Sequence, residues 1–206
     1  MKLRMPTVSI DNATRVLKVA NIFRYFLMIM PVIVLVYKDK GITTGDFFLI
    51  QGIFSFTVFL LEVPTGYIGD LFSRKKVMVI SSLITFLAHT YLLATDGFIN
   101  IMIVEMFWGL AAALMSGTMS AYLYDILEKQ KKENIVMKEE GALASSKMMS
   151  TSIATFSGGV IYNYFGANVL IIITSILMFI SCILFSILPD IKDNKRVMEK
   201  VKQEIL

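Results

Sequence analysis

The stretch that decides the fold is EVPTGYIGDLFSRKK, which runs from Glu62 to Lys76. It begins within an apolar segment and ends in three consecutive basic residues, Arg74 to Lys76. On a helix, Glu62, Gly66 and Asp70 recur at every fourth position, so the three share one face. The stretch therefore predicts the end of one membrane helix, a short basic loop and the start of the next helix.

The composition of the whole chain indicates a membrane protein. Of its 206 residues, 56% are hydrophobic, and the mean hydropathy is +0.69. A soluble domain cannot bury that much apolar surface and keep a polar exterior. The single cysteine, Cys182, excludes an internal disulfide and a cysteine-based metal cluster. The first apolar run lacks a small-residue cleavage site, so we expect it to remain in the protein as a span.

Uncharged apolar runs predict an all-α, polytopic fold with six transmembrane helices, because a bilayer core needs about 20 apolar residues per helix. Pro64 is expected to kink the second span. The uncharged run 148–189 is too long for one helix, and the segment 162–168 is expected to divide it. The predicted spans are 18–38, 46–71, 77–95, 99–127 and the two parts of 148–189. A charged loop is expected at 128–140. The bundle is thus expected over 18–189, between an N-terminal segment (1–17) and a tail (190–206) with a short amphipathic helix.

The basic residues indicate how the chain is oriented. All Lys and Arg except Arg24, Lys38 and Lys40 belong to the N-terminal segment, the loops after the second and fourth spans, or the tail. Such asymmetry places both termini in the cytoplasm, with the bundle in the plasma membrane. Topology therefore explains the net charge of +4, and no nucleic-acid partner is expected.

The pattern Gly66-x-x-x-Asp70-x-x-Ser73-Arg74-Lys75 resembles a family signature. In major facilitator superfamily transporters, the loop between the second and third helices reads roughly G-x-x-x-D-x-x-G-R-K, so Ser73 stands in place of a glycine. Six spans with cytoplasmic termini resemble the N-terminal half of such a twelve-helix transporter. The resemblance implies secondary active transport of a small solute by alternating access, with the first and fourth helices lining a cavity. It also implies a partner, which is either a C-terminal half or a second copy of the chain.

The same resemblance implies a gate at the cytoplasmic ends of the helices. The family's Asp–Arg–Asp charge relay corresponds here to Asp70, Arg74 and Asp125, with Gly66 and Lys75 completing the motif. Two carboxylates that share one guanidinium hold a closed state and release it on rearrangement. The alternative is a static ion cluster that only sets topology.

Small residues mark two further helix contacts. Gly109, Ala113, Gly117 and Ala121 recur at every fourth position of the fourth span and predict a continuous face for close helix packing. Gly158 and Gly159 end a partial match to the antiporter motif G-x-x-x-G-P-x-x-G-G in the fifth span. That match lacks the Gly-Pro.

Charged residues within spans are costly, so each is a candidate functional group. Arg24 and Glu62 are expected at similar depth. They either pair, or Glu62 takes up protons while Arg24 tunes its pKa or binds an anionic group. The structural alternatives are a fixed ion pair and an arginine that snorkels toward the headgroups. Glu105, with Trp108 beside it, is a candidate site for a cationic solute, the alternative being a hydrogen-bonded, protonated carboxyl. His89 is expected to be a packed or interfacial residue, the alternative being a proton relay.

No catalytic or metal-binding pattern is present in the sequence. We find no nucleophile–base pair, metal-ligand spacing or phosphate loop, so we expect neither an enzyme nor a cofactor. The alternative to a transporter half is a transport-incompetent membrane remnant, or a membrane subunit that binds a partner.

Overall fold

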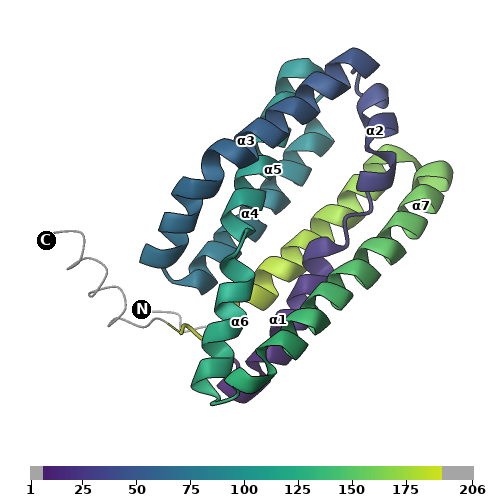
Figure 1. The fold of residues 1–206 in the computed structure, drawn as a ribbon. Coiled ribbons are helices and arrows are strands. Elements are labelled where there is room, and N and C mark those ends of the chain that lie inside the picture. The colour runs from purple at the N-terminus through teal and green to yellow at the C-terminus, as the bar shows by residue number, and fades with distance from the viewer. Residues whose placement is uncertain (1–6, 192–206) are drawn as a thin grey trace, which may run out of the picture.

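The computed structural model describes residues 7–191, apart from the side chains of 68–71. Within this range all regular structure is helical, and no strand occurs. The elements form an elongated bundle of long, roughly aligned helices (Figure 1). They are α1 (Ile10–Tyr25), η1 (Met30–Val32), α2 (Ile33–Asp39), α3 (Thr44–Leu71), α4 (Arg74–Ala94), α5 (Phe98–Met115), α6 (Thr118–Lys129), η2 (Glu133–Ile135) and α7 (Val136–Ser186).

Five continuous segments of the described chain are long and apolar enough to cross a membrane. The last of them, Glu133–Ser186, has 54 residues and contains α7. This helix reverses at Gly166, whose φ of 78° and ψ of 178° favour glycine. Figure 1 shows the two limbs of α7 side by side. The reversal lies within 162–168, where the sequence predicts a break.

The first span is interrupted, whereas the sequence predicts one helix over 18–38. Residues 26–29 separate α1 from η1 and α2. Pro31 has no N–H to donate to the carbonyl of Leu27, which instead accepts a bond of 3.2 Å from the N–H of Met30. A Cβ at Gly158 of α7 would overlap the carbonyl oxygen of Met28. The interruption therefore packs against α7 at a point where only glycine fits.

The fourth span is interrupted too, which corrects the continuous small-residue face predicted along it. Gly117 has a φ of 69° and separates α5 from α6. A Cβ there would meet nothing within 4 Å, so the need for glycine is conformational. Gly109 does lie at a close contact, because a Cβ at that position would come within 3.0 Å of the side chain of Thr57 on α3. Ala113 is buried, and Ala121 lies beyond the interruption on α6.

The α3 helix contains Pro64 and ends at Leu71, the residue at which the sequence predicts the end of the second span. One other boundary differs from the sequence-based expectation. The loop predicted over 128–140 is shorter, because α6 extends to Lys129 and α7 begins at Val136. Lys138, Glu139 and Glu140 favour helix by propensity, and Glu139 forms an ion pair with Lys18 of α1. The amphipathic helix predicted in the tail lies beyond Ile191 and so outside the described residues.

The bundle has two apolar cores along its length. One surrounds Tyr37, Ile101 and Trp108, and the other surrounds Tyr122, Leu127 and Phe185. The helix α7 packs on α1 and α4, while α5 packs on α3 and α4. The core around Tyr122 lies toward one end of the bundle, which we call the Arg74 end; the opposite end is the Lys40 end.

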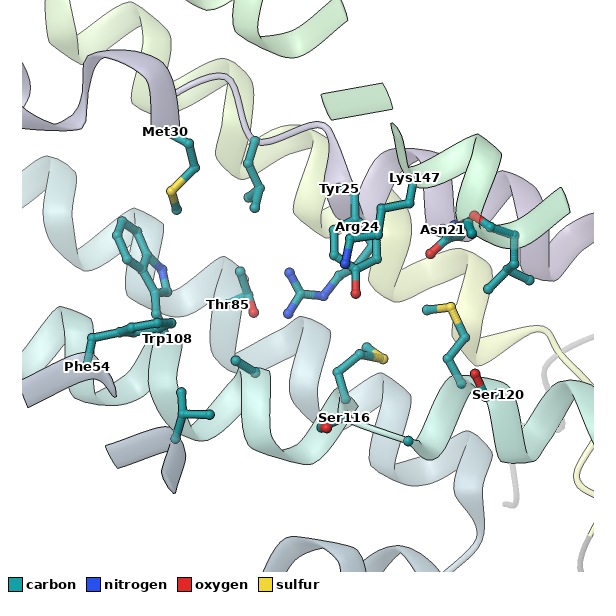
Figure 2. Close-up of a pocket in the computed structure, with 18 of the residues that line it drawn as sticks. Asn21, Arg24, Tyr25, Met30, Phe54, Thr85, Trp108, Ser116, Ser120 and Lys147 are labelled. Carbon is teal, nitrogen blue, oxygen red and sulfur yellow. Dashed lines mark hydrogen bonds between the residues drawn. The ribbon is translucent and has the colours of Figure 1, made fainter. Parts of the chain in front are cut away.

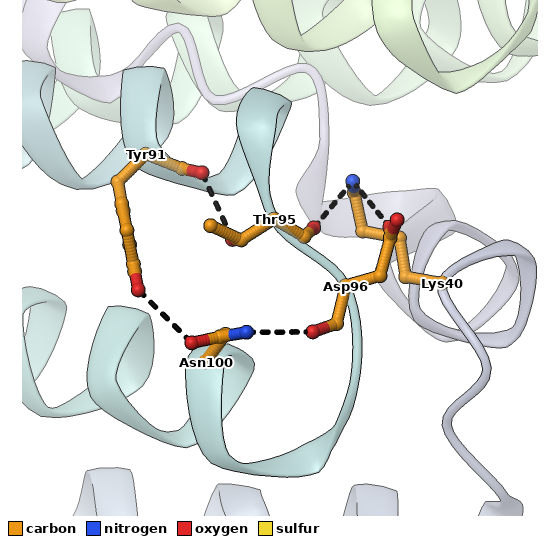
Figure 3. Close-up of polar contacts among 5 residues, drawn as sticks. All are labelled: Lys40, Tyr91, Thr95, Asp96 and Asn100. Atoms are coloured by element: carbon orange, nitrogen blue, oxygen red, sulfur yellow. Dashed lines mark hydrogen bonds and ion pairs between the residues drawn. The ribbon is translucent and has the colours of Figure 1, made fainter.

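Polar contacts tie two loops together at the Lys40 end (Figure 3). The buried Lys40 ammonium donates to the carbonyl oxygen of Thr95 at 2.8 Å and pairs with Asp96 at 3.1 Å. Asn100 donates to the Asp96 carbonyl oxygen at 2.8 Å and accepts from the Tyr91 hydroxyl at 3.0 Å. These contacts join the α2–α3 loop to the α4–α5 loop.

The helix α3 buries little of its surface within the bundle. In the most apolar 18-residue stretch of α3, only 11% is buried inside the bundle. The corresponding share is 39–50% in the other four candidate spans. Its outward face carries large apolar side chains, namely Phe48, Leu49, Phe56, Phe59, Leu60 and Val63. This helix therefore presents an apolar surface that lipid or another protein surface must cover.

Candidate functional site

A cavity of about 560 Å³ lies inside the bundle between the two apolar cores. Its walls come from α1, α3, α4, α5, α6 and the first limb of α7. Trp108, from the core around Tyr37, lines it together with Met115, from the core around Tyr122. Figure 2 shows the Arg24 side chain reaching into the middle of this space, between Trp108 on one side and Ser120 on the other.

Arg24 is the charged group in the interior of the cavity. It is only 7% exposed, and it makes no hydrogen bond or ion pair with any residue that the structure describes. Asn21, one turn earlier on α1, donates to the Leu143 carbonyl at 3.0 Å and to the Ser146 hydroxyl at 2.8 Å. Its Oδ1 is buried without a partner among the described residues. Two polar groups on one face of α1 are thus left available to the cavity.

Two further charged residues line the cavity. The Lys147 ammonium lies 4.4 Å from the centre of the Tyr25 ring, at cation–π distance. Glu140 accepts a hydrogen bond of 3.2 Å from Ser120. With Arg24, these side chains give the lining two positive charges and one negative charge.

Trp108 and His89 form an aromatic pair in the cavity wall. The indole Nε1–H lies 3.2 Å from His89 Nδ1, which is also 2.8 Å from the Thr85 carbonyl oxygen. One ring nitrogen cannot accept the first bond and donate the second at once. His89 Nε2 is buried without a partner among the described side chains. The histidine is fully buried, in line with the packed residue expected, and it also lines the cavity.

Glu105 lies next to this site but outside the cavity lining. Its Oε1 accepts 2.6 Å and 2.8 Å bonds from the Tyr37 hydroxyl and the Gln51 amide. The geometry therefore resembles the hydrogen-bonded carboxyl given above as the alternative to a cation site.

The structure does not bring Glu62 and Arg24 together. Glu62 is exposed on α3, and its carboxylate lies 3.4 Å from the Ser116 hydroxyl at the α5–α6 interruption. No ion pair joins it to Arg24 in the part of the chain that the structure describes. Ser116 itself lines the cavity, so Glu62 lies at its edge.

An ion pair stands at the Arg74 end. Arg74 Nη1 lies 2.5 Å from Asp125 Oδ2 and donates to the Ala121 carbonyl at 2.9 Å, which joins the start of α4 to α6. The third member of the predicted relay, Asp70, lies in α3, but its side chain is outside the described residues. Gly66 lies one turn earlier in α3, and a Cβ there would meet nothing within 4 Å. The arginine and one of the two carboxylates are thus together.

Ser73 makes a contact that sequence reasoning missed. Its hydroxyl donates to Asp190 Oδ1 at 2.6 Å, which links the residue before α4 to the segment after α7. Nearby, the Tyr122 hydroxyl donates to the Pro189 carbonyl oxygen at 2.6 Å. The glycine that the family pattern has at position 73 would lack this side-chain bond.

Other cavity residues were also missed, although the sequence carries some signal for them. Asn21 is a polar residue inside the first apolar span, at helical spacing from Arg24. Thr85 and Lys147 carry no such signal, because only the relative rotation of the helices turns them toward the cavity.

Comparisons with known proteins identify a family and similar sequences. Residues 19–204 match the model of the Major Facilitator Superfamily. An uncharacterized transporter of Buchnera aphidicola subsp. Acyrthosiphon pisum is 28% identical over 125 residues, covering 59% of this chain and 30% of that protein. A second uncharacterized transporter, from Buchnera aphidicola subsp. Schizaphis graminum, is 24% identical over 165 residues, covering 78% of this chain and 40% of that protein.

A solved structure shares the fold. The POT family transporter PepTSo superimposes with a TM-score of 0.72 at 15% sequence identity, over 88% of this chain and 37% of that one. At this identity the likeness concerns the fold alone. The chain thus spans less than half the length of each of these three proteins.

Proposed function

Since this chain belongs to the major facilitator superfamily, we propose that it forms the N-terminal six-helix half of a secondary active transporter that moves a small solute by alternating access. The observation that carries the proposal is the 560 Å³ cavity lined by six of the helices, with Arg24 unpaired inside it. A space of this size suits a small organic solute. Transport, rather than catalysis, is the role that the family implies.

The length of α7 supports six crossings. A straight helix of 51 residues would extend roughly 75 Å, whereas the hydrocarbon core is about 30 Å thick. The reversal at Gly166 supports two crossings in this segment. With four other candidate spans, the chain then crosses the membrane six times, and both termini lie on the same side.

The basic residues support the cytoplasm as that side. Arg74, Lys75 and Lys76 lie at the start of α4, and Lys129, Lys131 and Lys132 lie at the end of α6, in the same end of the bundle. A cytoplasmic Arg74 end in the plasma membrane agrees with the positive-inside rule.

The Arg74–Asp125 pair is proposed as one side of the gate. It joins α4 to α6 beside the cavity-lining stretch of α6, and its 2.5 Å contact is charge-assisted. Asp70 is the proposed second carboxylate, which takes over the guanidinium when the gate rearranges. Lys75 adds positive charge at the same membrane boundary.

The outward face of α3 supports a partner. An alternating-access transporter encloses its site between two halves that rock against each other. The second half is either a C-terminal half or a second copy of this chain, and the apolar face of α3 is where it would pack.

A cysteine-accessibility experiment tests the gate. Cys182→Ser removes the natural thiol, and Ala112→Cys places a reporter in the cavity wall. We expect Asp125→Asn to raise the rate at which an impermeant maleimide labels Ala112→Cys from the Arg74 side severalfold, because the α4–α6 tie is weakened. Glu133→Gln, an exposed carboxylate at the same end, is the matched control and should leave the rate unchanged.

Equal labelling of the Asp125→Asn and control variants would show that the Arg74–Asp125 pair is a static ion cluster and not a gate.

Proton coupling has a separate test, in which Glu62→Gln is expected to abolish proton-driven uptake in vesicles. Full proton-coupled uptake by that variant would exclude Glu62 as the coupling group.

A further inference from the structure

The buried guanidinium of Arg24 has no counter-charge in the described part of the molecule. It is 7% exposed, and its Nε is buried without an acceptor among the described groups. A buried charge is stable only when it is paired or hydrogen-bonded. The cavity is the space into which this side chain reaches (Figure 2), so the missing acceptor belongs there.

The other groups around Arg24 give the cavity a net positive lining. Lys147 adds a second positive charge, and Glu140 is the one acidic residue among the lining side chains. Glu140 is already bonded to Ser120, at the side of the cavity away from Trp108 in Figure 2. Glu105 is occupied by Tyr37 and Gln51 and lies outside the lining, so no free acidic side chain faces a cation near Trp108.

The wall beyond Arg24 is apolar and aromatic. Trp108, Phe54 and Met30 form it on the side of the cavity away from Ser120 (Figure 2). A solute that fills the space therefore needs an apolar part as well as a charged group. The guanidinium presents N–H donors in a planar fork that matches the two oxygens of a carboxylate or the oxygens of a phosphate.

We propose that the cavity is an anion site, which binds a small organic acid with its carboxylate or phosphate on Arg24 and its apolar part against Trp108. Lys147 adds a second positive charge in the lining of the site. This inference rests on the proposed transport function, since it names the class of solute that the transporter carries. It replaces the cationic solute that the sequence suggested for Glu105.

The chain carries its own reporter for this site. Trp108 is the only tryptophan, and it lines the cavity. Its fluorescence therefore measures occupancy directly in the purified full chain, without any transport assay. Nanodiscs made of phosphatidylcholine alone keep anionic lipid out of the measurement.

Three probes of similar size differ chiefly in charge. We expect phenylpropionate to change Trp108 emission saturably, and phenylpropanamide and phenylethylammonium to give an affinity weaker by about tenfold or more, since each 1.4 kcal/mol of lost interaction is a factor of ten. This comparison uses the unmodified chain, so it does not depend on any variant folding. Equal affinity for the acid and the amide, or tighter binding of the ammonium, would overturn the proposal.

Variants then locate the charge that binds the acid. Arg24→Gln should weaken phenylpropionate by about tenfold or more, and Arg24→Lys should retain part of the affinity. Arg15→Gln removes an exposed arginine from the same helix and should change nothing. If Arg24→Gln, with unchanged helical content, bound phenylpropionate as tightly as the unmodified chain does, Arg24 would not be the binding group.

A lipid headgroup offers similar chemistry, so one arm tests it. Adding phosphatidylglycerol to the nanodiscs should leave Trp108 emission unchanged without probe. An emission change that depends on Arg24 would show that a lipid headgroup binds at the site, and it would overturn the proposal that the ligand is a soluble organic acid. Transport is measured separately in vesicles of the native membrane, which also hold the proposed second half. If the acid bound but was not taken up, the anion site would stand and the proposed transport function would be wrong. If only neutral or cationic solutes were taken up, the transport function would stand and the anion site would be wrong.

Discussion

Glu105 is the one buried acidic residue among those whose side chains the structure describes, and it joins α2 and α3 to α5. It accepts from Tyr37 of α2 and from Gln51 of α3 at a single carboxylate oxygen. In hydrocarbon no water replaces such bonds, so each lost acceptor leaves a donor unsatisfied. The residue therefore stabilises the packing of three elements beside the cavity.

We predict that Glu105→Ala destabilises the protein by about 1–3 kcal/mol, because the Tyr37 hydroxyl loses its acceptor in a buried position. Glu105→Gln keeps an acceptor oxygen and should cost less. The measurement is loss of helical circular dichroism on titration with a denaturing detergent.

A double-mutant cycle with Tyr37→Phe checks the mechanism. Coupling of about 0.6–1.7 kcal/mol is expected, the range found for hydrogen bonds between membrane helices. Additive effects of the two substitutions would show that the hydrogen bond does not carry the stability.

At the scale of elements, the interrupted first span and the first limb of α7 determine each other's position. The carbonyl of Met28 is left out of a regular helix by the interruption before Pro31, and Gly158 allows α7 to approach it. Small residues are the usual means by which membrane helices approach so closely. The adjacent Gly159 points elsewhere, since a Cβ there would meet nothing within 4 Å.

This neighbouring pair gives a matched prediction. Gly158→Ala should destabilise the protein by about 1–3 kcal/mol, because the new methyl group forces the Met28 backbone to shift. Gly159→Ala should be neutral or stabilise by up to about 1 kcal/mol, since alanine favours helix over glycine. The same detergent titration measures both. Equal effects of the two substitutions would contradict the close contact.

How far these elements are predictable from sequence depends on whether the cause is local. The reversal at Gly166 lies within 162–168, where the sequence predicts a break, and the turn at Gly97 lies between the predicted spans 77–95 and 99–127. The interruption at Gly117 is not predicted, because glycine at helical spacing is equally consistent with a small-residue packing face. For the site, Arg24 and Trp108 stand out as a charge and the only tryptophan in apolar spans. Their partners Asn21, Thr85 and Lys147 depend on helix rotation, which periodicity does not determine.

At the scale of the whole molecule, the path of α7 sets the number of membrane crossings. In a Cys182→Ser chain, single cysteines replace Lys132, Asn168 or Asp190. We predict that an impermeant maleimide labels positions 132 and 190 from one side of the membrane and position 168 from the other, because the reversal at Gly166 returns the chain. Sealed vesicles of both orientations provide the measurement. Labelling of 132 and 190 from opposite sides would mean a single crossing.

The apolar face of α3 is where we expect the proposed second half to pack. Lipid contacts every outward face of the bundle. A partner half would contact one particular face, so protein contacts on that face distinguish it from lipid. Phe59 on α3 is 75% exposed, and Leu87 on another helix, α4, is 54% exposed. A photo-crosslinking residue at either position samples its neighbours in the native membrane.

We predict that the probe at Phe59 yields a specific protein adduct and that the matched probe at Leu87 yields only lipid adducts. Mass spectrometry of the crosslinked peptides identifies the partner. A peptide from this sequence means a second copy of the chain, and a peptide from another sequence means a C-terminal half. Lipid adducts alone from both positions would contradict a partner on α3 and favour a membrane remnant that acts without a second half.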